Sequence, residues 1–152
     1  MRPPTDESHL QLTRRNDWVP FLADLPIFQG VSKRHLHRIA RLATSRRFVP
    51  LTRIVREGEP ARTFYVVLDG TVSVTRKGRR IGKLGAGDAF GEMALLTESP
   101  RAATIVADSE VLTMCLSRTN FNKVLKSEPA VSMALLKTFA ERLRASERST
   151  SH

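Results

Sequence analysis

The residues that build disulfides, metal sites and catalytic centres are scarce in this sequence. Its 152 residues include one cysteine, Cys115, so an internal disulfide is excluded and a reducing compartment is expected. The four histidines are not clustered with cysteine, aspartate or glutamate at metal-ligand spacing, so no metal site is predicted. No Ser-His-Asp or paired-carboxylate pattern is present, and Gly85-Ala86-Gly87 lacks the Gly-Lys-Ser/Thr of a Walker motif. The sequence therefore favours a protein that is not an enzyme and carries no cofactor.

Long apolar runs are also lacking. No run approaches the ~18 residues that a membrane-spanning helix requires, and the first residues lack the apolar core of a signal peptide. A cytoplasmic protein of one domain is expected, because a chain of about 150 residues can bury most of its unfolded surface.

Acidic residues are outnumbered by basic ones. The 25 lysines and arginines against 15 aspartates and glutamates give a formal net charge of +10. This excess of positive charge is consistent with binding to nucleic acid, to an acidic membrane surface or to an acidic partner protein. It is equally consistent with a role in solubility alone. A basic cluster is interpreted as a solvated face, with a site for an acidic partner as the alternative; it consists of Lys33, Arg34, Arg38, Arg41, Arg46 and Arg47.

The chain divides into helical ends and a strand-rich middle. Residues 1–17 predict a flexible tail, and residues 18–44 predict N-terminal helices, one of them capped by Ser32. Six apolar runs separated by turn signals predict strands at residues 54–55, 64–68, 72–75, 81–84, 104–107 and 111–114. Residues 45–116 are therefore expected to form an antiparallel sandwich or jelly roll, with Cys115 as an inert core thiol.

Residues 117–146 predict two C-terminal helices, and residues 147–152 predict a tail. Ser117 or Thr119 can cap the first helix, and Pro129 opens the second. The apolar face of the second helix comprises Val131, Leu135, Leu136, Phe139 and Leu143. We interpret this face as core packing, with a role in a homodimer as the alternative.

One stretch interrupts the pattern of strands. After a glycine-rich turn comes a helix-compatible run of about four residues, and a strand is expected to resume at Arg101. Free N–H groups at the start of a short helix can bind an anion, Gly91 permits close approach of the backbone, and the guanidinium of Arg101 matches a phosphate. Glu92 can accept a hydrogen bond from a sugar hydroxyl. These groups fit a ribose phosphate, although an arginine and a glutamate nine positions apart are more often a structural ion pair.

Residues 90–104 resemble the phosphate-binding cassette of the cyclic nucleotide-binding domain family. The Phe-Gly-Glu opening, the small residue Ala94 and the Pro-Arg-Ala-Ala-Thr close stand at the spacing of this family, and the resemblance extends from about Trp18 to Arg144. It implies an α+β, mainly β, fold: an eight-stranded antiparallel jelly roll with N-terminal helices and two C-terminal helices. Residues 18–146 would form the cyclic nucleotide-binding domain.

The resemblance also implies roles for individual residues. It assigns Glu92 to the ribose 2′-hydroxyl and Arg101 to the cyclic phosphate, and it places Leu95 at an apolar hinge against the C-terminal helices. The full set of expected ligand-binding residues is Gly91, Glu92, Met93, Ala94, Arg101, Ala102 and Ala103, with backbone amides near Met93, Ala94 and Ala103 completing the cradle.

The identity of the base depends on fewer residues. Ala102 stands where cGMP-selective members often carry threonine, so cAMP is favoured over cGMP. No residue of the final helix is an obvious lid over the base, and Arg142 and Ser146 are candidates. The sequence departs from the family at Pro50-Leu51-Thr52, where the turn usually contains glycine, so a loop of different shape is expected.

The resemblance implies a bacterial cAMP receptor that signals to a protein partner through its C-terminal helices. One alternative is a cAMP-responsive transcription regulator of the catabolite-activator type, and another is the sensor domain of a channel or an enzyme. The sequence reaches His152 without a helix-turn-helix, so direct sequence-specific binding of nucleic acid is not expected. The start at Met1 and the polar end favour a complete short protein. A degenerate domain without ligand remains an alternative that Glu92 and Arg101 argue against.

Overall fold

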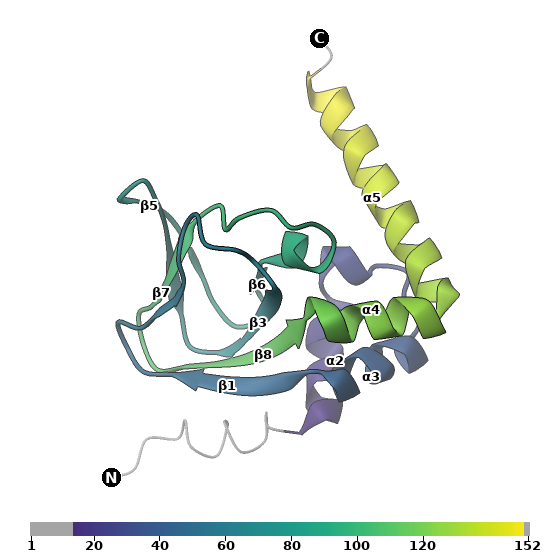
Figure 1. The fold of residues 1–152 in the computed structure, drawn as a ribbon, viewed down its shortest axis with the longest axis horizontal. Coiled ribbons are helices and arrows are strands. Elements are labelled where there is room, and N and C mark those ends of the chain that lie inside the picture. The colour runs from purple at the N-terminus through teal and green to yellow at the C-terminus, as the bar shows by residue number, and fades with distance from the viewer. Residues whose placement is uncertain (1–13, 151–152) are drawn as a thin grey trace.

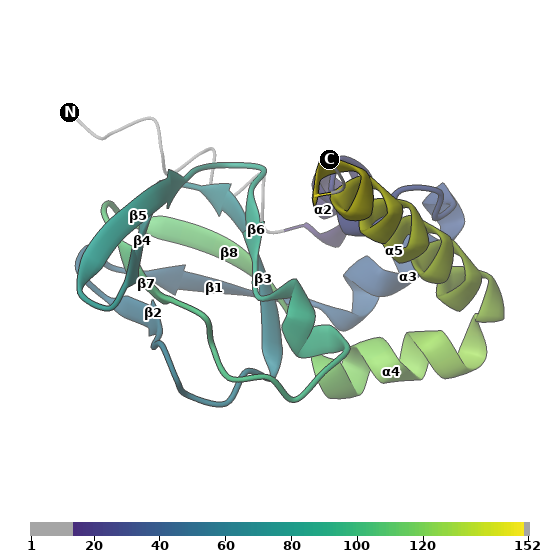
Figure 2. The same cartoon turned by 90° about the horizontal axis from the view of Figure 1, so that it is seen from above.

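The computed structural model describes residues 14–150. Within them, eight antiparallel strands form two four-stranded sheets that face each other, with helices gathered at one end (Figures 1 and 2). The strands are β1 (Thr44–Phe48), β2 (Arg53–Val55), β3 (Thr63–Asp69), β4 (Val72–Arg76), β5 (Arg79–Leu84), β6 (Ala89–Phe90), β7 (Thr104–Ala107) and β8 (Val111–Ser117). The order is β1-β8-β3-β6 in one sheet and β2-β7-β4-β5 in the other. The predicted jelly roll is confirmed.

Helices precede and follow the strands, and one 3₁₀ helix lies between β6 and β7. They are α2 (Arg15–Ala23), the 3₁₀ helices η1 (Pro26–Phe28) and η2 (Glu92–Leu95), α3 (Lys33–Leu42), α4 (Arg118–Ser127) and α5 (Pro129–Thr150). Ser32 caps α3 by accepting a hydrogen bond from the backbone N–H of His35, and Ser117 caps α4 in the same way through Asn120. Of the two predicted caps of α4, Ser117 is the one used.

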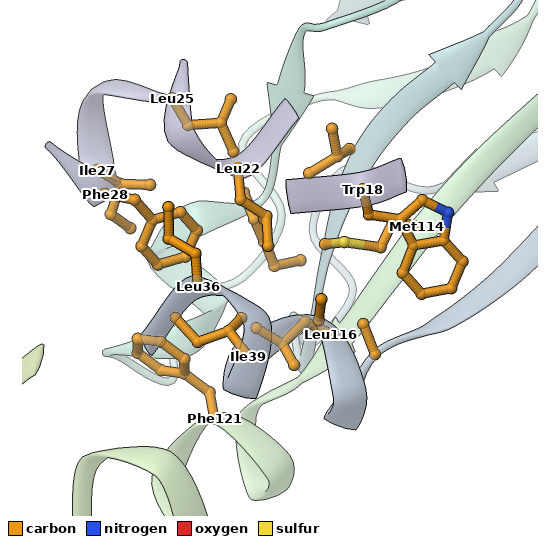
Figure 3. Packing of buried hydrophobic residues seen from close by; sticks show 14 of the residues in the cluster. Trp18, Leu22, Leu25, Ile27, Phe28, Leu36, Ile39, Met114, Leu116 and Phe121 are labelled. Atoms are coloured by element: carbon orange, nitrogen blue, oxygen red, sulfur yellow. The ribbon is translucent and has the colours of Figure 1, made fainter. Parts of the chain in front are cut away.

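Strands β3 and β8 are apolar on both faces, which explains their continuous hydrophobic runs. Phe64, Val66 and Leu68 of β3 pack against the helices, whereas Tyr65 and Val67 lie between the sheets. This alternation follows from the two-residue period of a strand. The helical core is shown in Figure 3. Cys115 of β8 is buried as predicted, and burial raises the pKa of its thiol.

The structure corrects several boundaries. Strands β1 and β6 were not among the six predicted runs. Strand β7 matches the predicted run at residues 104–107, but the strand does not resume at Arg101 as was also expected. Helix α2 begins at Arg15, inside the predicted tail of residues 1–17, because Trp18 is buried and Arg15 Nε donates to the Ala43 carbonyl at 3.2 Å. Residues 1–13 lie outside the described residues.

The C-terminal helix also differs from the prediction. Helix α5 continues through Thr150, beyond the predicted end at Ser146, and residues 151–152 lie outside the described chain. Val131 and Leu135 are buried, but Leu136 and Leu143 are 64 % and 62 % exposed. The reason is visible in Figure 1, where the later turns of α5 project away from the rest of the fold. No helix in the described part of the chain is long and apolar enough to cross a membrane.

Candidate ligand-binding site

A cavity of about 360 Å³ opens between η2, its flanking loops and the inner face of the β2-β7-β4-β5 sheet. Four aliphatic side chains from this sheet form one wall: Val55, Val74, Leu84 and Ile105. Every one of the seven predicted ligand-binding residues also lines the cavity. The volume lies within the range of about 300–1,000 Å³ that is usual for small-molecule sites.

Gly91 begins the cassette in a conformation that favours glycine. Its φ of +82° is left-handed, and the next four residues form η2. The Ala94 N–H donates to the Gly91 carbonyl at 2.9 Å, closing the first turn. The amide of Ala94, which was predicted to contribute to the cradle, is therefore already bonded within the chain.

Arg101 is fixed by its backbone and by its side chain. Its N–H donates to the Glu59 carbonyl at 2.8 Å, and its carbonyl accepts from the Gly58 N–H at 2.9 Å. The guanidinium Nη2 donates to the Thr63 carbonyl of β3 at 2.9 Å, and Arg101 Cζ lies 5.8 Å from the centre of the Tyr65 ring. The guanidinium is therefore held by strand β3, and the ion pair with Glu92 considered from the sequence is not formed.

The second terminal nitrogen of Arg101 is orphaned. Its Nη1 is buried and has no hydrogen-bond partner in the part of the chain that the structure describes. It packs so closely against Gly91 that a Cβ at that position would overlap it. A buried donor without an acceptor is unfavourable, so this nitrogen marks a place for a ligand acceptor.

Burial lowers the pKa of Arg101 from its ordinary value, and the neighbouring Tyr65 partly opposes this effect. Arginine nevertheless stays protonated in proteins at neutral pH. A positive charge at the wall of an otherwise largely apolar cavity attracts an anion, because the charge is poorly solvated there. The site therefore favours a small ligand with one anionic group and an apolar surface.

Glu92 lies between two cavities. It lines the first cavity and also a second one, of about 320 Å³, whose other charged residues are Asp24, Asp88 and Arg142. Arg142, a candidate lid, thus lies at the second cavity, with its Cζ 5.8 Å from the centre of the Phe139 ring. Ser146, the other candidate, is exposed on α5. Neither lines the first cavity in this arrangement.

Leu95 connects the cassette to the helical core. Its side chain is 1 % exposed and belongs to the same buried cluster as Phe121 and Val124 of α4. This is the place at which the family resemblance predicts a hinge. In the loop between β1 and β2, Leu51 takes a φ of 72°, so the loop that lacks the family's glycine still adopts a left-handed conformation.

Two residues of the site were missed from the sequence. Thr63 contributes only its carbonyl, which any residue can supply, and Arg118 lies 14 positions after the last residue of the cassette, Thr104. Arg118 Nε donates to the Ala94 carbonyl at 2.7 Å, and its Nη2 donates to the carbonyls of Ala61 and Thr97. Backbone acceptors have no sequence signature, so no pattern could have identified either contact.

The sequence and the fold are similar to known proteins. The family described as "Cyclic nucleotide-binding domain" matches residues 45–128. A cAMP-dependent protein kinase regulatory subunit of Yarrowia lipolytica is 34 % identical over 74 % of this chain, which spans 30 % of that protein's length. The N-terminal domain of a transcriptional regulator from Streptomyces coelicolor is 27 % identical, with a TM-score of 0.80 over 87 % of this chain and 98 % of the other.

A structure with bound ligand is also similar. The regulatory domain of Toxoplasma gondii PKA, solved with cAMP, is 29 % identical, with a TM-score of 0.67 over 88 % of this chain and 52 % of the other. This chain therefore corresponds to one part of several larger regulatory proteins.

Proposed function

Because the chain belongs to the cyclic nucleotide-binding domain family, we propose that it is a non-catalytic receptor for cAMP. Family membership implies a cyclic nucleotide ligand. The observation that carries the proposal is the buried Arg101 Nη1, which lacks a partner beside Gly91 at the wall of an otherwise mainly apolar cavity. A cyclic phosphate supplies the missing acceptor and neutralises the buried guanidinium in one contact.

The other groups of the cavity have complementary roles in this proposal. Glu92 accepts a hydrogen bond from the ribose 2′-hydroxyl, and backbone amides near Met93 and Ala103 complete the cradle around Gly91. The apolar wall formed by the β2-β7-β4-β5 sheet receives the base and the sugar edge. Residues 18–146 form the receptor domain, with the first turn of α2 extending it to Arg15.

The preference for cAMP rests on Ala102. Its methyl group offers the base no hydrogen-bonding group, whereas a threonine hydroxyl could bond the exocyclic amino group of guanine. Ala102 lines the cavity, and its carbonyl accepts from Arg76 Nε at 3.1 Å, which fixes this part of the wall. The names of the similar kinase subunits and the PKA structure with cAMP point in the same direction.

Binding is proposed to act on a protein partner through the C-terminal helices. Leu95 ties η2 to the core that contains α4, so an inward shift of the cassette would displace α4 and then α5. Such a response requires cAMP to bind one arrangement of the helices better than the other. The similarity to the N-terminal domain of a transcriptional regulator supports a second candidate, in which the domain is the sensor of a longer regulator.

Isothermal titration with cAMP tests the proposal. Arg101→Ala should weaken binding by about 30- to 4,000-fold, because loss of one partner of a buried charged contact costs ~2–5 kcal/mol. Arg101→Met, which keeps most of the side-chain volume, should lose binding to a similar extent. Arg80→Ala removes an exposed arginine and should bind normally. Equal affinities of the parent and both Arg101 variants would refute the assignment, and cGMP and 5′-AMP titrations report selectivity.

A further inference from the structure

Arg118, the first residue of α4, holds three segments together. Its Nε donates to the Ala94 carbonyl in η2 at 2.7 Å, while its Nη2 donates to the Thr97 carbonyl just after η2 and to the Ala61 carbonyl before β3 at 2.9 Å. Its Nη1 lies 3.5 Å from Glu98 Oε1. The Arg118 side chain is only 22 % exposed, so these bonds are largely shielded from water.

The backbone of Arg118 is anchored as well. Its N–H donates to the Arg62 carbonyl at 2.9 Å, which ties the start of α4 to the segment that leads into β3. Figures 1 and 2 both show η2 next to the beginning of α4. Because the guanidinium is planar and carries donors on three nitrogens, one arginine can bond carbonyls in two segments, whereas a lysine ammonium cannot reproduce this fork.

Arg101 and Arg118 contact opposite ends of the cassette helix. Arg101 packs beside Gly91, at the start of η2, and has a buried nitrogen without a hydrogen-bond partner among the described residues. Arg118 bonds the carbonyls of Ala94 and Thr97, at the end of η2 and just beyond it, and its terminal nitrogens serve the chain itself. One end therefore lies beside a donor that lacks an acceptor, and the other end is fixed to α4.

We propose that Arg118 is a positioning residue that holds the cassette in its binding geometry and carries its movement to α4. The inference rests on the proposed cAMP binding. When a ligand draws the start of η2 toward the cavity, the bonds of Arg118 pull the first turn of α4 along, and α5 follows because it continues from α4 after one intervening residue. Leu95 transmits the same shift by packing. Arg118 adds directional hydrogen bonds that keep η2 and the start of α4 from sliding past each other.

The test uses the full chain with spin labels at two exposed positions, Arg79→Cys in β5 and Lys123→Cys in α4. Cys115 stays in place, because it is buried and burial raises the pKa of its thiol, which disfavours labelling. The distance between the labels is measured with and without saturating cAMP, and cAMP affinity is titrated in parallel. The variants are Arg118→Met and Arg118→Lys, and the matched control is Arg62→Met, which alters an exposed arginine of the adjoining loop.

In the parent and in Arg62→Met, cAMP is expected to change the distance between the labels. Arg118→Met is expected to bind cAMP at least tenfold more weakly and, once saturated, to keep the ligand-free distance. Arg118→Lys is expected to resemble Arg118→Met, and it keeps the test decisive if the methionine variant does not fold. A loosened fold alone would lower affinity without removing the distance change.

A normal distance change in a saturated Arg118 variant overturns the proposal, whatever its affinity. A parent that binds cAMP without any distance change overturns it too, together with the proposed displacement of α4, and leaves the proposed cAMP binding intact. A parent that does not bind cAMP contradicts the proposed function itself. The failures of the two proposals are thus distinguishable in one experiment.

Discussion

The molecule contains two apolar interiors that differ in how completely they are filled. The core between the helices and the β1-β8-β3-β6 sheet packs Trp18, Phe28, Phe64 and Phe121 with almost no exposure. Figure 3 shows Trp18, Phe28 and Phe121 in this core. The Phe28 ring lies 6.3 Å from both Phe64 and Phe121, measured between ring centres. The interior between the two sheets has its own buried cluster but also contains the ligand cavity.

The same strands supply both interiors. Alternate residues of β3 enter the helical core or the space between the sheets, so a single strand joins the stable region to the binding region. The helical core buries its large side chains almost completely, as protein interiors normally do. The space between the sheets contains a cavity, and at its wall the buried Arg101 Nη1 has no hydrogen-bond partner among the described residues. The helices therefore pack on one face of the β1-β8-β3-β6 sheet, whereas the proposed ligand lies between its other face and the β2-β7-β4-β5 sheet.

A matched pair of leucine truncations tests this difference, and its effect should be the largest. Leu22→Ala removes a fully buried side chain from the helical core and should lower the free energy of unfolding by about 2.7–5.0 kcal/mol. Leu84→Ala removes a half-buried side chain that already borders the cavity and should lower it by about 1 kcal/mol. Urea unfolding without ligand measures both values.

The cAMP affinities of the pair should show the reverse order. Leu84→Ala changes a cavity wall and should weaken binding, whereas Leu22→Ala should leave the affinity nearly unchanged at a temperature where it is folded. If both truncations lower stability equally, the two interiors are packed alike and the comparison is wrong.

A pair of glycine substitutions separates backbone strain from the close contact at Arg101. Gly91 and Gly30 have φ values of +82° and +84°, so alanine should destabilise each site by about 1–2 kcal/mol. A Cβ at Gly91 would overlap Arg101 Nη1 and approach the Thr63 carbonyl at 3.1 Å, whereas nothing lies within 4 Å of a Cβ at Gly30. Gly91→Ala should therefore also weaken cAMP binding by about tenfold or more, or 1.4 kcal/mol.

Thermal unfolding measures the stability of each variant, and cAMP titration measures its affinity for the ligand. Gly30→Ala should lose stability and keep its affinity, because it lies between η1 and α3 and outside the residues that line the cavity. Similar affinities of Gly91→Ala and Gly30→Ala would mean that the guanidinium of Arg101 does not need its present position.

The sequence predicted all four strands of the sheet that borders the cavity but only two of the four strands in the other sheet. Continuous apolar runs identified β3 and β8, because burial on both faces leaves little room for polar residues. Strand β1 was missed because Ser45, Arg46 and Arg47 are exposed and only Phe48 of this strand is buried. Strand β6 was missed because it has two residues, Ala89 and Phe90, which is too short for any period.

The site was predicted from side chains and missed where it depends on backbone carbonyls. Gly91, Glu92 and Arg101 were identified by residue type and spacing together with the family resemblance, and all three line the cavity. The Thr63 carbonyl that anchors Arg101 and the carbonyls that Arg118 bonds follow from tertiary packing alone. The exposed Leu136 and Leu143 show the opposite failure, since helical spacing predicts an apolar face but not where the helix leaves the core.

The smallest effect is expected at Ala102. A substitution at this cavity wall should change the ligand preference without lowering the stability of the fold. Ala102 is exposed at the cavity wall, so Ala102→Thr should alter the free energy of unfolding by no more than about 0.5 kcal/mol. Its hydroxyl can add one hydrogen bond to guanine, worth about 0.5–1.5 kcal/mol. The ratio of cGMP to cAMP affinity should therefore rise by about 2- to 10-fold. Ala102→Val has the same shape without the hydroxyl and should leave the ratio unchanged. If valine raises the ratio as much as threonine does, shape rather than hydrogen bonding selects the base at this wall.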